Sequence, residues 1–301
     1  MTLNNDSLKK ISIIFSVAVA LFLIILKFIA FIKTDSLAIL SSLVDSITDL
    51  FASAISGVAV YFSMKPATYA HRYGYGKSEA LSALLQSLFI AISGLFVIAD
   101  GVNRLIHPVE LYNSDVGVLI MIVSVFVTLI LVLFQTYVAK KTNSLAISAD
   151  RAHYIVDFLT NGTVIISLIL VKTIGFVYFD IIAAFVISIY LLYNAYDLAK
   201  EAVDMITDKE LGDDVRNNII ETAQSVDNVR GIHDLRTRNL GNFYFIEMHI
   251  EIDGDMTLFK THQITENVEE SIKEQYPNSQ ILIHQDPFGI DEKRLDSDII
   301  I

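Results

Sequence analysis

Long runs of apolar residues, each of a length that can cross a bilayer, fill the chain from residue 11 to residue 200. A transmembrane helix needs about 20 mostly apolar residues, because each residue advances the helix by only ~1.5 Å. Six stretches meet this requirement and are joined by short connections: Ile11–Ile32, Leu37–Phe62, Glu79–Ile106, Val116–Ala139, Ser144–Lys172 and Phe176–Lys200. The pattern predicts an α-helical membrane protein with six transmembrane helices in a domain that spans residues 1–207.

From residue 208 onward the pattern changes to short alternations of apolar and polar residues, which are typical of a soluble domain. The expected elements are a helix, two strands joined around Gly241-Asn242, a second helix and a last strand: Asp213–Val226, Gly231–Leu240, Phe243–Ile252, Thr257–Gln275 and Ser279–His284. The order αββαβ predicts a ferredoxin-like α+β domain over residues 208–290, with the helices on one face of the sheet. Residues 291–301 are expected to form a flexible charged tail.

Acidic residues are concentrated in this second part of the chain. Residues 1–207 carry 13 Lys or Arg and 14 Asp or Glu, whereas residues 208–301 carry 9 and 20, so the net charge of −12 belongs almost wholly to the second part. This change of composition supports a domain boundary near Asp208. An acidic surface disfavours nucleic acid and attracts cations, although acidity that only keeps the domain soluble explains the same composition.

Basic residues near the ends of the predicted spans set their orientation, because cytoplasmic loops carry the excess of Lys and Arg. If the helices alternate, seven basic residues fall on the side of the N-terminus and three on the other: Lys9, Lys10, Lys65, Arg72, Lys77, Lys140 and Lys141 against Lys33, Arg104 and Lys172. We therefore expect both termini and the acidic domain in the cytoplasm. Lys27 lies near enough to the end of the first span for its ammonium group to reach the membrane interface.

Two pairs of metal-ligating residues lie inside the predicted spans. Asp45 and Asp49 share one face of the second span, and His153 and Asp157 share one face of the fifth, in a polar stretch that begins at Asp150. An ionisable group inside a bilayer costs at least ~2.5–3.5 kcal/mol and usually marks a transport path or functional site. A hydrogen bond between helices would explain one such residue, but four at matched depth favour a site for a divalent metal.

The second part of the chain holds four of the seven histidines, His233, His249, His262 and His284, and Asp286 follows closely after the last. Each lies near the end of an expected strand or helix, so they would converge in the folded sheet, and neutral imidazole is a common metal ligand. Scattered surface histidines explain the spacing equally well. Because the chain has no cysteine, any metal site must use His, Asp, Glu or Asn.

Five motifs along the chain resemble those of the cation diffusion facilitator family. They are the two intramembrane pairs, the loop His71-Arg-Tyr-Gly-Tyr-Gly-Lys77-Ser-Glu79, the stretch His233-Asp-Leu-Arg-Thr-Arg and the ending Ile-His284-Gln-Asp286-Pro. The resemblance extends over residues 10–290. It implies a homodimeric, proton-coupled exporter of divalent cations in the bacterial inner membrane, with the dimer formed through the cytoplasmic domain.

The resemblance also implies ligands, residue by residue. The transport site would consist of the four intramembrane residues Asp45, Asp49, His153 and Asp157. A binuclear cytoplasmic site, which would bind structural or regulatory ions, would consist of His233, His249, His262, His284 and Asp286, with Asp286 as the bridge.

Two further features of the family fall on the loop after the second span. The family has a third site there, made by an Asp and two His, but Thr68 and Tyr75 stand in two of these positions, so only His71 remains and we expect a weak metal site or none. Lys77 and Asp208 resemble a charge interlock between the loop and the cytoplasmic domain.

Ligand chemistry predicts how such a protein would work. Metal binding requires deprotonated carboxylates and neutral imidazole, so it must release protons, and protons from outside would displace the metal. His153 is the natural titrating member, with Asp157 beside it. An oxygen-rich site with one nitrogen and no sulfur suits Zn²⁺, Fe²⁺, Cd²⁺, Co²⁺ or Mn²⁺, and the histidine favours zinc and iron. We expect no organic cofactor and no nucleic-acid partner.

Other classes of protein remain alternatives to a secondary transporter. A membrane-tethered metal sensor would need only the cytoplasmic domain and would leave the intramembrane ligands without a role. An intramembrane metallohydrolase would need a motif such as His-Glu-x-x-His, which the sequence lacks. A passive channel would need no protonatable group at its site.

Overall fold

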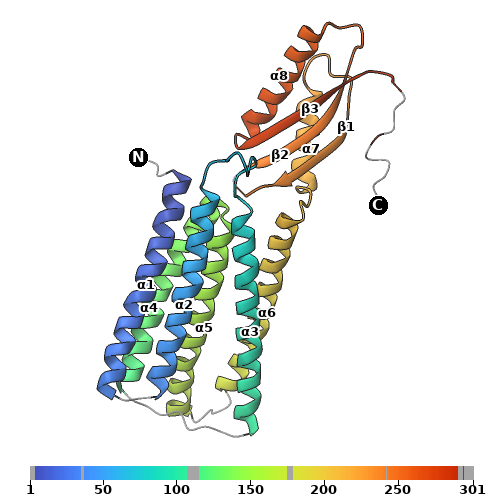
Figure 1. The fold of residues 1–301 in the computed structure, drawn as a ribbon. Coiled ribbons are helices and arrows are strands. Elements are labelled where there is room, and N and C mark those ends of the chain that lie inside the picture. Colours follow the sequence, from blue (N-terminus) through green and yellow to red (C-terminus); the bar gives the residue numbers. More distant parts are fainter. Residues whose placement is uncertain are drawn as a thin grey trace. The chain divides into compact units, whose positions relative to one another are not determined.

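The structure is a computed structural model, and it describes residues 4–34, 37–106, 115–174, 179–241, 243–290 and 294. The chain divides into two compact units, Met1–Val203 and Asp204–Ile301. The first unit is helical and the second combines helices with a sheet (Figure 1).

Long helices occupy each of the six stretches that the apolar pattern predicts. They are α1 (Asn5–Thr34), α2 (Leu37–Ser63), α3 (Ser78–Ile106), α4 (Asp115–Thr142), α5 (Leu145–Ile174) and α6 (Phe179–Ile206). Among the described residues, four stretches are long and apolar enough to cross a membrane: Asn5–Ile32, Asp45–Ser63, Ser78–Asn103 and Leu119–Thr142. The expectation of six such spans is therefore met by α1 to α4 only. The crossing of the membrane by α5 and α6 stays a prediction.

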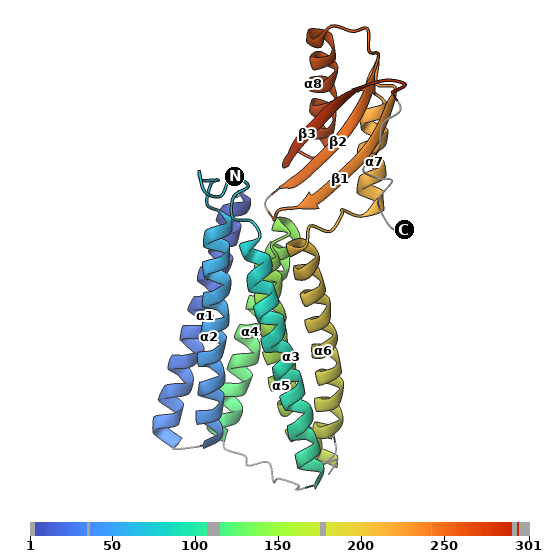
Figure 2. The same cartoon turned by 45° about the vertical axis from the view of Figure 1, so that its right-hand side comes forward.

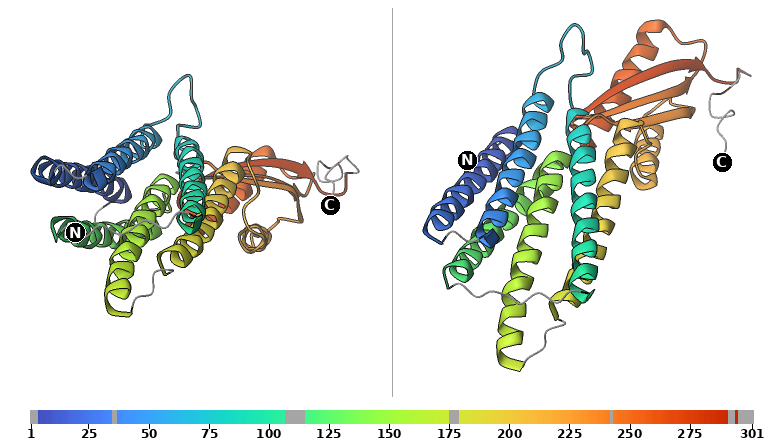
Figure 3. Two further views of the ribbon diagram at one scale, coloured as in Figure 1. Left: turned by 90° about the horizontal axis from the view of Figure 1, so that it is seen from below. Right: turned by 60° about the horizontal axis from the view of Figure 1, so that its bottom comes forward.

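The helices of the first unit run alongside one another (Figure 2), and small polar side chains are buried between them. On α2, Ser46, Ser53 and Ser56 are fully buried, whereas Phe51 and Val58 are exposed on the surface of the bundle. Helices in lipid associate through close packing and polar contacts rather than through burial of large apolar groups, which lipid solvates equally well. Figure 3 shows α3 beside α6. A Cβ on Gly94 of α3 would lie 3.4 Å from side-chain atoms of Leu191 and Leu192 of α6.

A buried ion pair ties the helices together at one end of the bundle. The carboxylate of Glu79, in the first turn of α3, accepts hydrogen bonds from Lys9 Nζ of α1 at 2.8 Å and from Ser63 Oγ of α2 at 2.7 Å. It also accepts one from the Oγ of Ser144, which immediately precedes α5, at 2.5 Å. All four residues are buried. Glu79 therefore joins α1, α2, α3 and the start of α5.

The second unit has the predicted order of elements. They are α7 (Asp213–Gln224), β1 (Gly231–Asn239), β2 (Tyr244–Ile252), α8 (Leu258–Gln275) and β3 (Ser279–Pro287). The strands form one sheet in the order β1-β2-β3, in which β1 is antiparallel and β3 parallel to β2. A parallel neighbour needs a crossover connection, which α8 provides. The last strand extends beyond the predicted His284, so Asp286 lies within the sheet, paired with Glu251.

Both helices of this unit pack against one face of the sheet. Ile219 of α7 and Val268 of α8 share a buried core with Ile246, Met248 and Ile250 of β2. Because side chains alternate along a strand, the odd-numbered residues of β2 point to the opposite face. That face, which α7 and α8 leave uncovered, carries His233, His249 and His284.

Candidate metal sites

The intramembrane cluster is built by α2 and α5, which lie side by side in the bundle (Figure 1). Asp49 comes from α2, and His153 and Asp157 come from successive turns of α5. The ligand atoms of these three residues all lie within 4.8 Å of one another. His153 Nε2 is 2.9 Å from Asp49 Oδ1, and both residues are buried. The packing of these two helices thus joins side chains from distant parts of the sequence.

Asp157 has a buried oxygen that lacks a partner. Its Oδ2 atom receives no hydrogen bond from the described part of the chain. Leaving a buried acceptor unsatisfied costs about 1–3 kcal/mol, and more for a charged group. A cation held among Asp49, His153 and Asp157 would supply the missing partner, and one nitrogen with carboxylate oxygens is a suitable donor set for Zn²⁺ or Fe²⁺.

Asp45, expected as the fourth ligand, lies one turn before Asp49 on α2 and is exposed on the surface of the first unit. It is not one of the three residues whose ligand atoms lie within 4.8 Å of one another. The other three predicted ligands are brought together, whereas the participation of Asp45 stays a prediction.

The expectation that Lys27 reaches the membrane interface is wrong. Lys27 is only 5% exposed, and its ammonium group donates a hydrogen bond to Ser46 Oγ of α2 at 2.6 Å. It interacts electrostatically with the carboxylates of Asp45, Asp49 and Asp157. The packing of α1 against α2 directs this lysine inward. Its ammonium group is therefore a fixed positive charge near the metal ligands.

The cytoplasmic cluster is a row of three histidines across the sheet. The register pairs His233 of β1 with His249 of β2, and His249 with His284 of β3. The ring centroids of His233 and His249 are 5.0 Å apart, and those of His249 and His284 are 4.6 Å apart. Three imidazoles from three strands therefore lie next to one another on the uncovered face.

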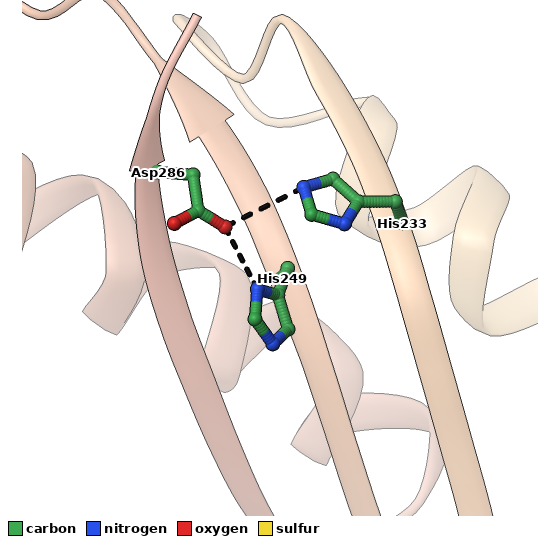
Figure 4. Close-up of side chains that lie close together, drawn as sticks. All are labelled: His233, His249 and Asp286. Atoms are coloured by element: carbon green, nitrogen blue, oxygen red, sulfur yellow. Dashed lines mark hydrogen bonds and ion pairs between the residues drawn. The ribbon is translucent and has the colours of Figure 1, made fainter. Parts of the chain in front are cut away.

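Asp286 lies among these histidines and directs its two oxygens to different rings. Oδ2 is 2.8 Å from His249 Nδ1 and 3.4 Å from His233 Nε2. Figure 4 shows this carboxylate directed toward both rings. Oδ1 is 3.1 Å from His284 Nε2. The ligand atoms of His233, His249 and Asp286 lie within 4.8 Å of one another. A carboxylate whose two oxygens face different imidazoles suits a bridge between two ions, and this role of Asp286 stays a prediction.

A bulge in β1 positions His233, and the sequence analysis did not predict it. The register shifts between His233 and Arg236, and Asp234 has a φ of 52°. The extra residue breaks the strict alternation, so His233 faces the uncovered side of the sheet while Leu235 enters the core. His233 Nδ1 lies 3.3 Å from Asp234 Oδ2, and a hydrogen bond from Nδ1–H to this carboxylate would leave Nε2 to act as a metal ligand.

Glu251 is a further carboxylate at this site that the sequence analysis did not select. Its Oε1 is 3.9 Å from His233 Nε2 and accepts a hydrogen bond from Arg294 Nη2 at 2.6 Å. Its position two residues after His249 places it on the same face of β2, and this spacing was the signal in the sequence.

His262 is not brought to this cluster within one chain. It lies near the start of α8, on the other side of the sheet, where its Nε2 is 3.4 Å from Glu266 Oε1. Its side chain is 62% exposed. The membership of His262 in the cytoplasmic site stays a prediction.

His71, in the loop after α2, lies in a cluster with two uncharged residues. Its Nδ1 is 3.0 Å from the hydroxyl of Tyr75, and that hydroxyl is 3.3 Å from Thr68 Oγ1. The ring centroids of His71 and Tyr75 are 4.5 Å apart. The expectation of a weak metal site or none in this loop stays a prediction. Its physical basis is that the imidazole of His71 is already hydrogen-bonded to Tyr75.

The expected interlock between Lys77 and Asp208 joins residues of different units and stays a prediction. Within the second unit, Asp208 Oδ2 is 3.4 Å from Arg238 Nη1.

Comparison with known protein families gives two matches along the chain. Residues 13–207 match the cation efflux transmembrane domain, and residues 211–288 match the cytoplasmic domain of cation efflux proteins. Together the two matches cover nearly all of the chain, and each falls on the corresponding compact unit.

Curated relatives match over the same extent. The chain is 40% identical over 273 residues to the cation-efflux pump FieF of Serratia proteamaculans, which is 91% of each protein. It is 41% identical, over the same shares, to the cation-efflux pump FieF of Yersinia pestis. Among solved structures, the metal-bound C-terminal domain of the CzcD transporter from Thermotoga maritima is 31% identical and covers 26% of this chain and 93% of its own, with a TM-score of 0.25.

Proposed function

Because the chain belongs to the cation diffusion facilitator family, and is thus a cation efflux transporter, we propose that it exports Zn²⁺ or Fe²⁺ from the cytoplasm in exchange for protons. Cd²⁺, Co²⁺ and Mn²⁺ are further candidate substrates, since the same donor set accepts them. The observation that carries this proposal is the buried cluster of Asp49, His153 and Asp157.

The cluster explains how metal transport would be coupled to proton transport. In the metal-free site, the proton shared by His153 and Asp49 at 2.9 Å partly neutralises the buried charges. A divalent cation needs the imidazole nitrogen and the carboxylate oxygens as lone-pair donors, so it displaces that proton when it binds. Protons that enter from the other side of the membrane reverse the exchange. Metal and proton therefore compete for the same atoms, and this competition is what an antiporter requires.

The transport site must face each side of the membrane in turn. Its three ligands come from α2 and α5 only, so a change in the packing of the helices around this pair would expose it alternately without taking the ligands apart. Asp45, on the same face of α2, would complete a tetrahedral site when that packing changes.

The cytoplasmic domain is proposed to bind regulatory ions at His233, His249, His284, Asp286 and His262. Because His262 lies away from the other four within one chain, a second copy would have to contribute it, which agrees with a homodimer formed through this domain. The protein would be located in the inner membrane, with both termini in the cytoplasm.

A membrane-tethered metal sensor is the second candidate, because the histidine row on the sheet would serve a sensor equally well. It differs from a transporter in that no metal would cross the membrane. The buried intramembrane cluster favours transport.

The test is metal-driven proton flux in proteoliposomes that contain the purified protein and a pH-sensitive dye. The wild type should move protons when Zn²⁺ is added, and Asp157→Asn should abolish this flux with little change in helix content. Asp197→Asn is the matched control, because Asp197 is an exposed carboxylate on α6 outside the cluster. No flux in the wild type would favour a sensor, and full flux in Asp157→Asn would refute the assignment of this site.

A further inference from the structure

A second buried polar cluster lies between the same helices, about one turn from the metal ligands. It centres on Asp150 of α5, which is fully buried. Its neighbours are Ser16 of α1, Ser53 of α2, Gln135 of α4 and Tyr154 of α5, which are also fully buried. The proposed metal site uses none of these side chains.

The carboxylate of Asp150 is held by uncharged donors. Ser53 Oγ donates to Oδ1 at 2.9 Å, and Gln135 Nε2 donates to Oδ2 at 2.7 Å. Gln135 Nε2 also lies 2.9 Å from Ser16 Oγ, so four helices meet at this point. A carboxylate that is buried in a membrane without a cation partner is expensive in its charged form, so burial favours the neutral, protonated acid.

The polar groups around Asp150 can all form hydrogen bonds whether its carboxyl group is ionised or protonated. The change from one state to the other requires no movement of heavy atoms. With the carboxylate ionised, the Tyr154 hydroxyl donates to Ser53 Oγ at 3.0 Å, and Ser53 donates to Asp150. With a proton on Oδ1, the chain reverses: Asp150 donates to Ser53, Ser53 donates to Tyr154, and Tyr154 donates to the carbonyl oxygen of Ser16 at 3.4 Å. Hydroxyl hydrogens rotate freely, so the reversal needs only their reorientation.

Gln135 serves both states. Its Nε2–H donates to Oδ2 of Asp150 whether that oxygen belongs to a carboxylate or to the carbonyl of the acid.

The charged groups that face this cluster from the surrounding helices are those of the metal site. They are Asp49 on α2 and His153 and Asp157 on α5, whereas α1 and α4 contribute the uncharged Ser16 and Gln135. Arg151 follows Asp150 directly and projects about 100° away around α5. The electrostatic potential at Asp150 therefore depends on whether the metal site binds a metal ion or protons.

We propose that Asp150 is a proton-holding site of the transporter, distinct from the metal ligands, whose proton is released when a divalent cation binds at Asp49, His153 and Asp157. The O–H bond of the acid breaks, the proton passes to water, and the ionised carboxylate is stabilised by the added positive charge one turn away and by the hydroxyl of Ser53. When protons displace the metal, the same site is refilled. This inference rests on the proposed function, because it adds a proton to the exchange.

The test counts the protons released when Zn²⁺ is added to the purified full-length protein in weakly buffered detergent solution, together with the number of ions bound. Asp150→Asn preserves the shape of the side chain and cannot ionise. It should bind as many ions as the wild type and release roughly one proton fewer per intramembrane ion. The cytoplasmic site contributes equally to both proteins and cancels in the difference.

A second pair of variants guards against a failure of Asp150→Asn to fold. Ser53→Ala removes the donor to the ionised carboxylate and should move part of the proton release to higher pH. Ser56→Ala is the matched control, because Ser56 is equally buried on α2 but donates to the carbonyl of Ala146. It should leave the release unchanged.

The outcomes separate this inference from the proposed function. If the wild type releases protons and drives flux but Asp150→Asn releases as many, Asp150 holds no exchangeable proton and the inference is refuted. If the wild type itself shows no metal-driven proton flux, the antiport proposal fails instead.

Discussion

Removal of one partner from the buried ion pair between Lys9 and Glu79 should destabilise the helix bundle strongly. Lys9→Met is the informative change, because Met retains the length and apolar character of the side chain without the charge. It leaves the Glu79 carboxylate, which is 3% exposed, without its cation.

The magnitude follows from the contacts that remain. Loss of one member of a buried pair typically costs about 3–5 kcal/mol, because the other charge stays buried. The hydroxyls of Ser63 and Ser144 still donate to the Glu79 carboxylate at 2.7 and 2.5 Å and offset part of this cost. We therefore expect a loss of about 3 kcal/mol in the free energy of unfolding, at the lower end of the range.

The double variant Lys9→Met/Glu79→Met should be more stable than Lys9→Met alone. It removes both charges, and replacing a buried pair by apolar residues of similar size is often neutral or stabilising. Lys10→Met is the control, since Lys10 is the adjacent but exposed lysine of α1, and its loss should change the stability by less than about 0.5 kcal/mol.

The assay is denaturant unfolding of the purified proteins in detergent, followed by far-ultraviolet circular dichroism. The reasoning would be refuted if Lys9→Met were as stable as Lys10→Met. Equally, the charges would not stabilise each other if the double variant lost as much stability as the single variants Lys9→Met and Glu79→Met lost in sum.

Three further changes test other parts of the structure. Lys27→Met should tighten Zn²⁺ binding at the membrane site by on the order of tenfold in calorimetry, because one positive charge near the carboxylates is lost; Lys10→Met should not. His249→Ala should abolish Zn²⁺ binding to the cytoplasmic cluster, and in the wild type that binding should weaken as the pH falls, since protons compete for the imidazoles. Ile250→Ala should destabilise the cytoplasmic domain by about 2–5 kcal/mol through loss of core packing, whereas Leu282→Ala, at an exposed position, should change the stability little.

Most of the fold follows from patterns that are local in the sequence. Runs of about 20 apolar residues predicted the membrane helices, and the alternation after residue 207 predicted the αββαβ order. The spacing of His153 and Asp157 predicted that they share a face of α5, because this depends only on helical geometry. The last strand was predicted too short, since Asp286 and Pro287 are poor strand formers and only their pairing with β2 holds them in the sheet.

The candidate sites depended more on tertiary structure. Lys27 was expected at the interface, but the packing of α1 on α2 buries it against Ser46. The bulge at Asp234, which turns His233 toward the uncovered face, has no strong signal in the sequence. The sequence also grouped His262 with the other histidines, whereas α8 carries it to the opposite side of the sheet.

The sequence by itself determined which residue types are available and how they are spaced within each helix and strand. Those facts were sufficient to indicate a membrane protein with carboxylates and imidazoles at the positions of ligands. Only the tertiary structure decided that Asp49 Oδ1 lies 2.9 Å from His153 Nε2, and that the carboxylate of Asp150 accepts hydrogen bonds from Ser53 and Gln135. The physical reason is that periodicity acts over a few residues, whereas contact between helices depends on the close packing of whole surfaces.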